Sequence, residues 1–272
     1  MIRRFISVVH RRLIMLHRLN IIKTLVFNFK VLPFRQALKF PVYIYGKTEL
    51  YDLSGKVVIN GVIESGMIKM GYRWIDLWPQ SNLPTQISLR GDLIVEGRII
   101  MSGGVSVFVE NKDARIIIGE HCLLGGGSMI KCMKHISIGK GTRITRNCTL
   151  MDTNMHYVKN IVTGKVSYPH GEIKIGDFCW INADTTVTKG TIIPDYSIVA
   201  RGGFLSKDYS ANGNNAFIVG SPAEIKNNTV QRIFSYSKEV ELKHKFLSQH
   251  EIIINDGPGL FEEDNYFFDN LF

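Results

Sequence analysis

Residues able to do acid–base chemistry gather in one short segment, MDTNMH, residues 151–156. An imidazole titrates near pH 6.5, so His156 can take up or release a proton close to neutrality. Asp152 and Asn154 precede it at two-residue spacing, and both could reach the same cleft. Asp152 could orient the imidazole or hold a hydroxyl group, but an aspartate here could equally form an Asx turn that shapes the loop. The segment predicts either a proton-transfer site or a solvated loop histidine.

The remaining residues with metal-binding chemistry do not form a metal site in the sequence. None of the four cysteines belongs to a CxxC pair, which argues against structural zinc. His121, His135, His156 and His170 are each at least 14 residues apart, whereas a zinc site usually draws two ligands from nearby positions. We therefore expect no metal. Reduced thiols and the lack of a cleavable signal favour the cytoplasm.

The elements that must position these residues follow a period of six. An aliphatic residue recurs along the chain, with one two-residue phase shift and one long interruption, as Ile118, Leu124, Ile130, Ile136, Ile138, Ile144, Leu150, Ile175, Ile181, Val187, Ile193, Val199 and Leu205. Four positions after nine of these residues stands a small residue, namely Cys122, Ser128, Thr142, Cys148, Cys179, Thr185, Thr191, Ser197 or Gly203, whereas Lys134 breaks this column. Helices and hairpins lack this period, but a parallel β-helix has it. The sequence therefore predicts a β-class solenoid whose inward column includes three of the cysteines.

The periodic region divides the chain into three parts. We expect a basic amphipathic helical arm over residues 1–48, with the helix itself extending to about residue 40. The β-helix should occupy 50–225, with insertions at 67–86 and 152–172. A C-terminal helix and an acidic tail should follow over 226–272. Loops that interrupt a solenoid are its usual binding sites.

The net charge of +9 is a property of the arm. Residues 1–48 hold ten Lys or Arg and no acidic residue, which leaves 23 basic and 24 acidic residues in the rest of the chain. This distribution argues against nucleic acid as a partner of the main body. The arm carries too many charges to span a bilayer. Two interpretations stay open: residues 1–30 lie on an anionic membrane surface, or they pack against the solenoid or a neighbouring subunit.

The stretch 116–226 resembles the hexapeptide-repeat acetyltransferases, the family that includes the maltose, galactoside and serine O-acetyltransferases. The resemblance rests on the segments IIIGEHCLLGGG, ISIGKGTRITRNCTLMDTNMH, IKIGDFCWINADTTVTKGTIIPDYSIVARGGFLSKD and IVGSPAEIK, which cover about two-fifths of the chain. The long N-terminal part is similar to the branch that acetylates bacterial surface polysaccharides. The resemblance implies a left-handed parallel β-helix, a homotrimer with active sites between subunits, and acetyl-CoA as the donor.

For the acceptor side, the resemblance implies that His156 is the catalytic base, which takes the proton of a sugar hydroxyl as it attacks the thioester. Asp152 is expected beside it as a second catalytic residue and Asn154 as an acceptor-binding one. His170, at the far end of the same insertion, is the alternative histidine. Gly125 stands where the galactoside enzyme's pattern has an acceptor-binding asparagine, so this acceptor geometry differs.

For the donor side, the resemblance implies a CoA site in the coils after Trp180. The residues expected to bind it are Trp180, Ala183, Arg201, Lys207 and Lys226. Backbone amides around Ala183 and Arg201 would bind the pantetheine arm, and the two lysines would face the CoA phosphates. Glu224 stands where the family often has a basic residue, which weakens or rearranges the phosphate contacts.

Aromatic residues concentrate in the first insertion, at Tyr72, Trp74 and Trp78. Their faces could stack on the apolar faces of sugar rings, so Trp74 and Trp78 are candidate acceptor-binding residues. Aromatic excursions also pack against a solenoid's side or a subunit interface. Both interpretations are left open by the sequence.

We therefore expect an O-acetyltransferase that acts on a carbohydrate hydroxyl in surface polysaccharide assembly, in the cytoplasm and peripheral to the inner face of the membrane. The alternatives are a non-catalytic scaffold or membrane-associated interaction protein, and an acyltransferase with a non-sugar acceptor such as serine. The γ-type carbonic anhydrases share the fold, but their histidine zinc site has no counterpart in the spacing found here.

Overall fold

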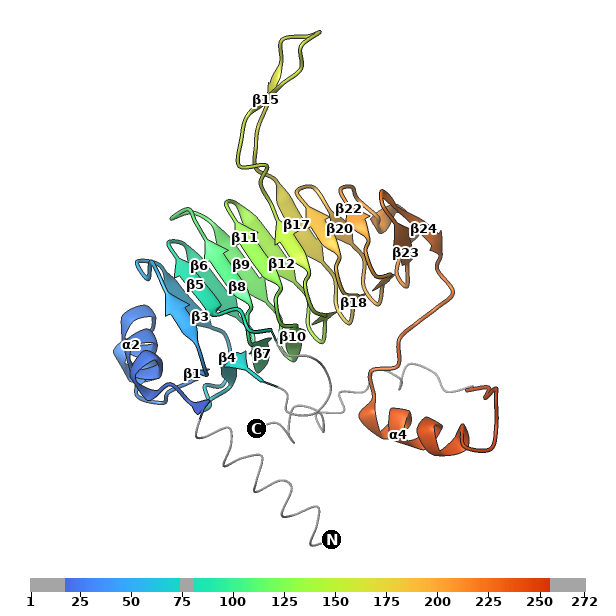
Figure 1. The fold of residues 1–272 in the computed structure, drawn as a ribbon, viewed down its shortest axis with the longest axis horizontal. Coiled ribbons are helices and arrows are strands. Elements are labelled where there is room, and N and C mark those ends of the chain that lie inside the picture. The colour runs from blue at the N-terminus through green and yellow to red at the C-terminus, as the bar shows by residue number, and fades with distance from the viewer. Residues whose placement is uncertain (1–17, 74–80, 255–272) are drawn as a thin grey trace, which may run out of the picture.

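The computed structural model describes residues 18–73 and 81–254, most of which form a parallel β-helix (Figure 1). Three sheets of stacked parallel strands run along it, and each turn of the chain adds one strand to each sheet. We call them the first, second and third sheet in the order in which the chain visits them. The predicted parallel β-helix, flanked by helical segments, is confirmed.

The strands are short and stack in register. The first sheet contains β1 (Val42–Ile44), β4 (Ile68–Tyr72), β7 (Ile99–Ser102), β10 (Cys122–Leu124), β13 (Arg143–Ile144), β18 (Trp180–Ile181), β21 (Ile198–Val199), β23 (Phe217–Gly220) and the antiparallel β24 (Ala223–Asn227). The second contains β2 (Thr48–Leu50), β5 (Thr85–Leu89), β8 (Ser106–Val109), β11 (Met129–Cys132), β14 (Thr149–Met151), β19 (Thr186–Thr188) and β22 (Phe204–Leu205). The third contains β3 (Lys56–Ile59), β6 (Asp92–Val95), β9 (Arg115–Ile118), β12 (His135–Ile138), β17 (Glu172–Ile175) and β20 (Ile192–Ile193).

The aliphatic column forms the core. Register pairing places Ile118 beside Ile138 and Ile138 beside Ile175, so identical positions of successive turns stack on one another. Almost every member of the column is fully buried. Because a parallel β-helix encloses its own interior, one inward residue per strand is enough to build a continuous core. The period of six predicted this arrangement correctly.

The small column lies inside the corners, where side chains bond to the backbone. The Thr142 hydroxyl donates to the carbonyl of Gly176 at 2.9 Å, and the Ser128 hydroxyl donates to that of Thr145 at 2.8 Å. The cysteine thiols serve the same purpose as compact, weakly polar groups. Burial raises the pKa of the Cys179 thiol to about 12, so this thiol stays protonated and unreactive.

The N-terminal segment differs from the prediction. The helix expected up to about residue 40 is interrupted in the described part: α2 (Ile21–Val31) ends before Pro33, and α3 (Phe34–Ala37) is a single turn. The β-helix begins at β1, before the predicted residue 50, because Val42 pairs in parallel with Ile68. Buried Asn28 ties α2 to this first turn, bonding the carbonyl of Val42 at 2.7 Å and its amide at 3.1 Å. Residues 1–17 lie outside the described part.

The first insertion is also shorter than the predicted 67–86. Strands β4 and β5 occupy both of its ends, and Ile68 and Met70 are buried against β7. A shift of register between Met70 and Tyr72 hides this strand from a search for six-residue repeats. Trp74 and Trp78 lie outside the described residues, so their sugar-stacking role stays a prediction.

The second insertion, predicted at 152–172, is a loop that leaves the β-helix after β14 and returns at β17. It carries the antiparallel pair β15 (Val158–Lys159) and β16 (Val166–Ser167), which project far from the body (Figure 1). After β24 the chain forms α4 (Tyr236–Lys245), whose N-cap Ser235 accepts a bond from the amide of Lys238. Within the described residues, no helix has the length and apolar character needed to cross a bilayer. The acidic tail from residue 255 onward is not described.

Candidate active site on a loop and two edges

The loop that carries His156 is rooted firmly in the β-helix. Its two ends are joined by a hydrogen bond from the Gly171 amide to the Asp152 carbonyl at 2.8 Å. One residue further out, Thr153 forms an antiparallel bridge with His170, and the Thr153 hydroxyl lies 2.8 Å from His170 Nδ1. The ammonium group of Lys189, from the next turn, donates a hydrogen bond to the Tyr168 carbonyl at 2.9 Å. These contacts fix the position from which the outer loop extends.

Asp152 does not reach the cleft as expected. It is fully buried, and its carboxylate accepts hydrogen bonds from the amides of Met133, Lys134 and His135 at 2.7–2.9 Å. A buried carboxylate needs such donors to offset its loss of hydration. The proposed contact with His156 is absent from the described structure. Asp152 therefore positions the root of the loop rather than touching a substrate.

This arrangement also explains why Lys134 breaks the column of small residues. At several other corners a hydroxyl or thiol from within the same column bonds the backbone, as Ser128 and Thr142 do. At this corner the Asp152 carboxylate, which arrives from the adjacent turn, binds the corner amides instead. The irregularity at Lys134 was the sequence signal for this structural role.

His156 itself lies on the exposed part of the loop. Its amide donates to the Asn154 carbonyl at 2.7 Å, which holds the segment in a tight bend. Its imidazole has no hydrogen-bond partner in the part of the chain that the structure describes, and Asn154 is likewise exposed. An unengaged imidazole on a rooted loop can accept a proton from a bound hydroxyl group. His170, by contrast, is tied to Thr153 and serves the loop base.

Beyond His156 the loop exposes a run of large apolar side chains. Those at the tip are the most accessible, with Ile161 92% exposed and Val162 89% exposed. Tyr157, Val166 and Tyr168 are also exposed. An apolar projection of this kind is costly in water unless another surface covers it.

The predicted donor residues Ala183 and Arg201 lie on a different edge, where the chain passes from the first to the second sheet. Ala183 joins β18 to β19, and Arg201 joins β21 to β22 one turn later. The two corners stack, since the Gly202 amide donates to the Ala183 carbonyl at 3.0 Å. The amide N–H groups of Ala183 and Arg201 donate no hydrogen bond to any described residue. Two neighbouring N–H groups without an acceptor among the described residues suit a ligand that presents carbonyl oxygens along this edge.

The side chain of Arg201 is already engaged. Its guanidinium binds the Asp184 carboxylate at 2.7 and 2.8 Å, and the Asn147 amide donates to the other Asp184 oxygen at 3.1 Å. The bonds from Asn147 and Arg201 lower the pKa of Asp184. Arg201 therefore offers a ligand its backbone rather than a free charge.

Lys207 and Lys226 lie apart from these amides. Lys207 follows β22, at the edge between the second and third sheets, and its ammonium is 2.5 Å from the Glu224 carboxylate. Lys226 is exposed on β24. The unusual Glu224 thus neutralises the cation that was expected to face CoA phosphates. The expected donor residues flank the same end of the second sheet, but they do not form one cluster.

Trp180 is covered by the C-terminal segment, which the sequence did not predict. The Arg232 guanidinium lies 4.9 Å from the Trp180 ring centre and 4.8 Å from that of Phe234. Burial lowers the pKa of Arg232, and the stacking between two rings offsets part of its lost hydration. This contact joins residues more than 50 positions apart, so local pattern could not predict it. The Trp180 ring supports this packing rather than an open donor site.

Tyr72 also packs inward. Its ring makes an edge contact with Tyr45 at 5.3 Å between centres, and both side chains are buried. Tyr72 is therefore not available as a sugar platform. No group of three or more His, Cys, Asp or Glu residues able to hold a metal occurs in the described ranges.

No protein-family model matches this sequence, and no curated protein matches it either. Among solved structures, the chain is similar to the polySia-specific acetyltransferase NeuO, with 16% identity, coverage of 76% of this chain and 99% of that chain, and a TM-score of 0.45. It is similar to the polysialic acid O-acetyltransferase OatWY, with 16% identity, coverage of 81% and 98%, and a TM-score of 0.38. It is also similar to AntD, an N-acyltransferase from Bacillus cereus in complex with dTDP-4-amino-4,6-dideoxyglucose and coenzyme A. That likeness has 13% identity, coverage of 76% and 87%, and a TM-score of 0.38.

Proposed function

We propose that this chain is an O-acetyltransferase that moves an acetyl group from acetyl-CoA to a hydroxyl of a carbohydrate, with His156 as the general base. The observation that carries the proposal is the exposed, unengaged imidazole of His156 on a loop whose root is fixed by Asp152. An accessible base that no described residue engages, on a loop whose root is fixed, suits the activation of a weak nucleophile.

The chemistry divides between the donor and this chain's residues. Acetyl-CoA, when bound, supplies an activated thioester carbonyl, so no covalent acyl-enzyme is needed. His156 takes the proton of the acceptor hydroxyl as the new ester bond forms, and returns a proton to the departing thiolate. A base of this kind contributes about 10²–10⁴-fold in rate. Asn154, exposed two residues away, is suited to hold the acceptor by a hydrogen bond.

The residues at the predicted donor site are suited to bind acetyl-CoA. The free amides of Ala183 and Arg201 can donate to the amide carbonyls of a pantetheine arm along the edge between the first and second sheets. Lys226 is exposed to meet a phosphate, while Lys207 would have to share its charge with Glu224. Backbone groups therefore contribute more to donor binding here than cationic side chains.

A homotrimer accounts for the separation of His156 from the donor amides. The loop leaves the edge between the second and third sheets, whereas Ala183 and Arg201 lie on the edge between the first and second. In a three-fold assembly, the projecting loop of one subunit would cover the donor edge of its neighbour. The exposed apolar side chains around Ile161 would be buried by this contact.

A peripheral position on an anionic membrane agrees with the outer face of α2 and α3. Ile22, Val26 and Phe34 are exposed there, and Lys30 and Arg35 lie beside them. Apolar side chains that enter the interface, with cations that face anionic headgroups, are typical of interfacial helices. This placement would bring the enzyme to a polysaccharide acceptor assembled at the inner face of the membrane.

The proposal is tested by the melting temperature of the full-length protein titrated with acetyl-CoA, with acetate and ATP as controls. Saturating ligand at about 100 times its Kd should stabilise the fold by about 2.7 kcal/mol. The His156→Ala variant should show the same shift but transfer acetyl groups to sugar acceptors at least ~10²-fold more slowly. A wild-type protein whose melting temperature ignores millimolar acetyl-CoA would instead support a non-catalytic scaffold.

A further inference from the structure

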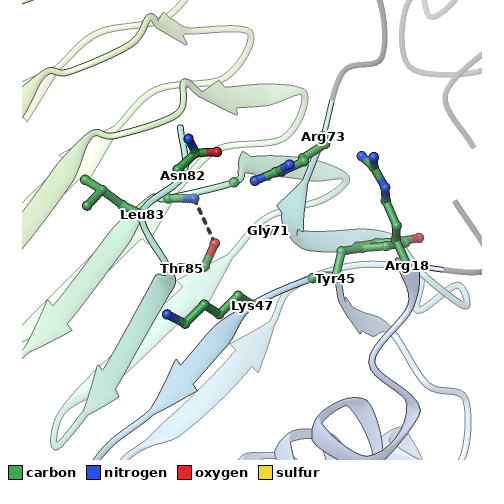
Figure 2. Close-up of a pocket in the computed structure, with 11 residues that line it drawn as sticks. Arg18, Tyr45, Lys47, Gly71, Arg73, Asn82, Leu83 and Thr85 are labelled. Carbon is green, nitrogen blue, oxygen red and sulfur yellow. Dashed lines mark hydrogen bonds between the residues drawn. The ribbon is translucent and has the colours of Figure 1, made fainter. Parts of the chain in front are cut away.

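A pocket lies far from the loop of His156, at the N-terminal end of the β-helix (Figure 2). It has a volume of about 240 Å³ and lies where the chain passes from the first to the second sheet in the first three turns. Figure 2 shows Arg18, Arg73 and Lys47 around it, with Arg73 directed toward Asn82. Nothing in the proposed acetyl transfer uses these residues.

The pocket exists because glycine occupies its corners. Gly46 has a φ of +60°, and a Cβ atom built on it would meet no atom within 4 Å, so this corner opens into free space. At Gly71 a Cβ atom would lie 2.4 Å from the Tyr45 carbonyl oxygen, and at Gly104 one would lie 2.4 Å from Ser81 Oγ. Side chains at these corners would obstruct the turn and fill the hollow.

The first cation is held in place by the backbone. Leu19 forms an antiparallel bridge with Tyr45, and the Gly46 amide donates to the Arg18 carbonyl at 2.9 Å. This short ladder fixes the position of Arg18 at the rim, immediately before α2. The long basic arm is thus attached to the β-helix at the pocket itself.

The second cation, Arg73, is oriented by a single hydrogen bond. Arg73 donates from Nη2 to the Ser81 carbonyl at 3.1 Å, and its Cγ atom lies 3.4 Å from the position that a Cβ on Gly103 would occupy. The rest of its guanidinium fork has no hydrogen-bond partner in residues 18–73 and 81–254. No acidic residue is among the described residues that line the pocket, so none of these described lining residues neutralises the three cations.

We propose that this pocket binds a phosphate group, carried either by a soluble sugar phosphate or by a lipid headgroup. Guanidinium groups bind phosphate oxygens through two parallel hydrogen bonds, which makes arginine the preferred residue for this anion. A phosphate monoester carries a charge of about −1.5 to −2, which matches several cations better than a single carboxylate does. The volume accommodates the phosphate and part of the group attached to it.

The test measures phosphate binding directly and does not require acetyl-CoA, so its result is independent of the proposed transfer reaction. One arm titrates methyl phosphate into the full-length protein at low salt and follows the heat. The other arm compares flotation with vesicles that carry phosphatidic acid, whose headgroup is a phosphate monoester, and with vesicles that carry phosphatidylglycerol, whose phosphate is a diester. The variants are Arg73→Gln, Arg18→Gln and Arg73→Lys, with Arg115→Gln, an exposed arginine of the third sheet, as the matched control.

We expect saturable binding in one arm that weakens at least about tenfold in Arg73→Gln and Arg18→Gln, and less in Arg73→Lys. The control should bind as wild type does. A heat response identifies a soluble phosphate ester. Without a heat response, stronger flotation with phosphatidic acid than with phosphatidylglycerol, weakened in Arg73→Gln and Arg18→Gln, identifies a lipid headgroup. Binding in neither arm, or an equal loss in Arg115→Gln, would overturn the proposal, provided that melting temperatures show all variants folded.

Discussion

The candidate donor edge at the C-terminal end of the β-helix and the pocket at its N-terminal end differ in how their cations are paired. At the donor edge, Arg201 is paired with Asp184 and Lys207 with Glu224, while the amides of Ala183 and Arg201 donate to no described residue. At the N-terminal end, the pocket cations have no acid among the described lining residues. The same β-helix therefore presents uncharged backbone N–H groups at the donor edge and positively charged side chains at the N-terminal pocket. The comparison suggests that the two ends bind chemically different groups.

The loop of His156 divides these two ends, and replacing His156 gives the largest expected effect. His156→Ala should lower acetyl transfer by at least ~10²-fold because the acceptor hydroxyl loses its base. Turnover is measured with acetyl-CoA and a panel of sugars, and the melting temperature should stay unchanged since the side chain is exposed. His250→Ala, an exposed histidine near the C-terminus, is the control. Near-normal turnover would remove His156 as the base.

Asp152→Ala should act on stability rather than on the chemical step. The substitution leaves three corner amides without their acceptor in a buried site, which we expect to lower the free energy of unfolding by roughly 3 kcal/mol. Urea denaturation measures the loss, with the exposed Asp113→Ala as the control. A loss below about 1 kcal/mol together with a loss of turnover would return Asp152 to a direct catalytic role.

At the N-terminal end, the outer face of α2 can be altered without touching the core. Ile22 is 74% exposed and Val26 is 52% exposed, so the double change Ile22→Glu/Val26→Glu should leave the melting temperature intact. Binding to phosphatidylglycerol vesicles should fall at least ~10-fold, because two inserting side chains become anionic. Leu247→Glu, equally exposed at the other end, should not change binding. Unaltered vesicle binding in the double variant would favour packing against a neighbouring subunit.

The sequence predicted the periodic half of the molecule well because each turn repeats the same local rule. The aliphatic column and the small column follow directly from strand and corner geometry. The N-terminal turns were less predictable, since β4 has an irregular register and carries no six-residue marker. The roles of Asp152 and Arg232 depend on contacts with other turns, which no local pattern contains.

A smaller effect is expected for Glu224→Gln, which removes the carboxylate that pairs with the ammonium of Lys207 near the donor edge. We expect acetyl-CoA to bind roughly threefold more tightly, because an exposed ion pair contributes only ~0.2–1 kcal/mol. Titration calorimetry measures the change, and Glu110→Gln is the matched control. Weaker binding would mean that Glu224 itself contacts the donor. Its pairing with Lys207 would then not be what limits the binding of acetyl-CoA.

The smallest expected effect concerns Asp184, whose pKa is lowered by the hydrogen bond from Asn147 and by Arg201. Because its pKa in the folded state is below the unfolded value of about 3.9, its stabilisation is present above that pH and is lost as the pH falls through the folded pKa. The wild type should therefore lose more stability than Asp184→Asn between pH 5 and about pH 2. The asparagine also tolerates the φ of +60° at this corner, so the backbone is retained.

Melting temperatures of the two proteins across this range, with Asp113→Asn as the control, measure the difference. Parallel curves would show that the bond between Arg201 and Asp184 does not persist in solution. Arg201 would then be free to bind a phosphate. The donor edge would no longer differ from the N-terminal pocket in having its cations paired, because the Arg201–Asp184 pair is part of that difference. A smaller acid loss in Asp184→Asn would instead support donor binding through the backbone amides.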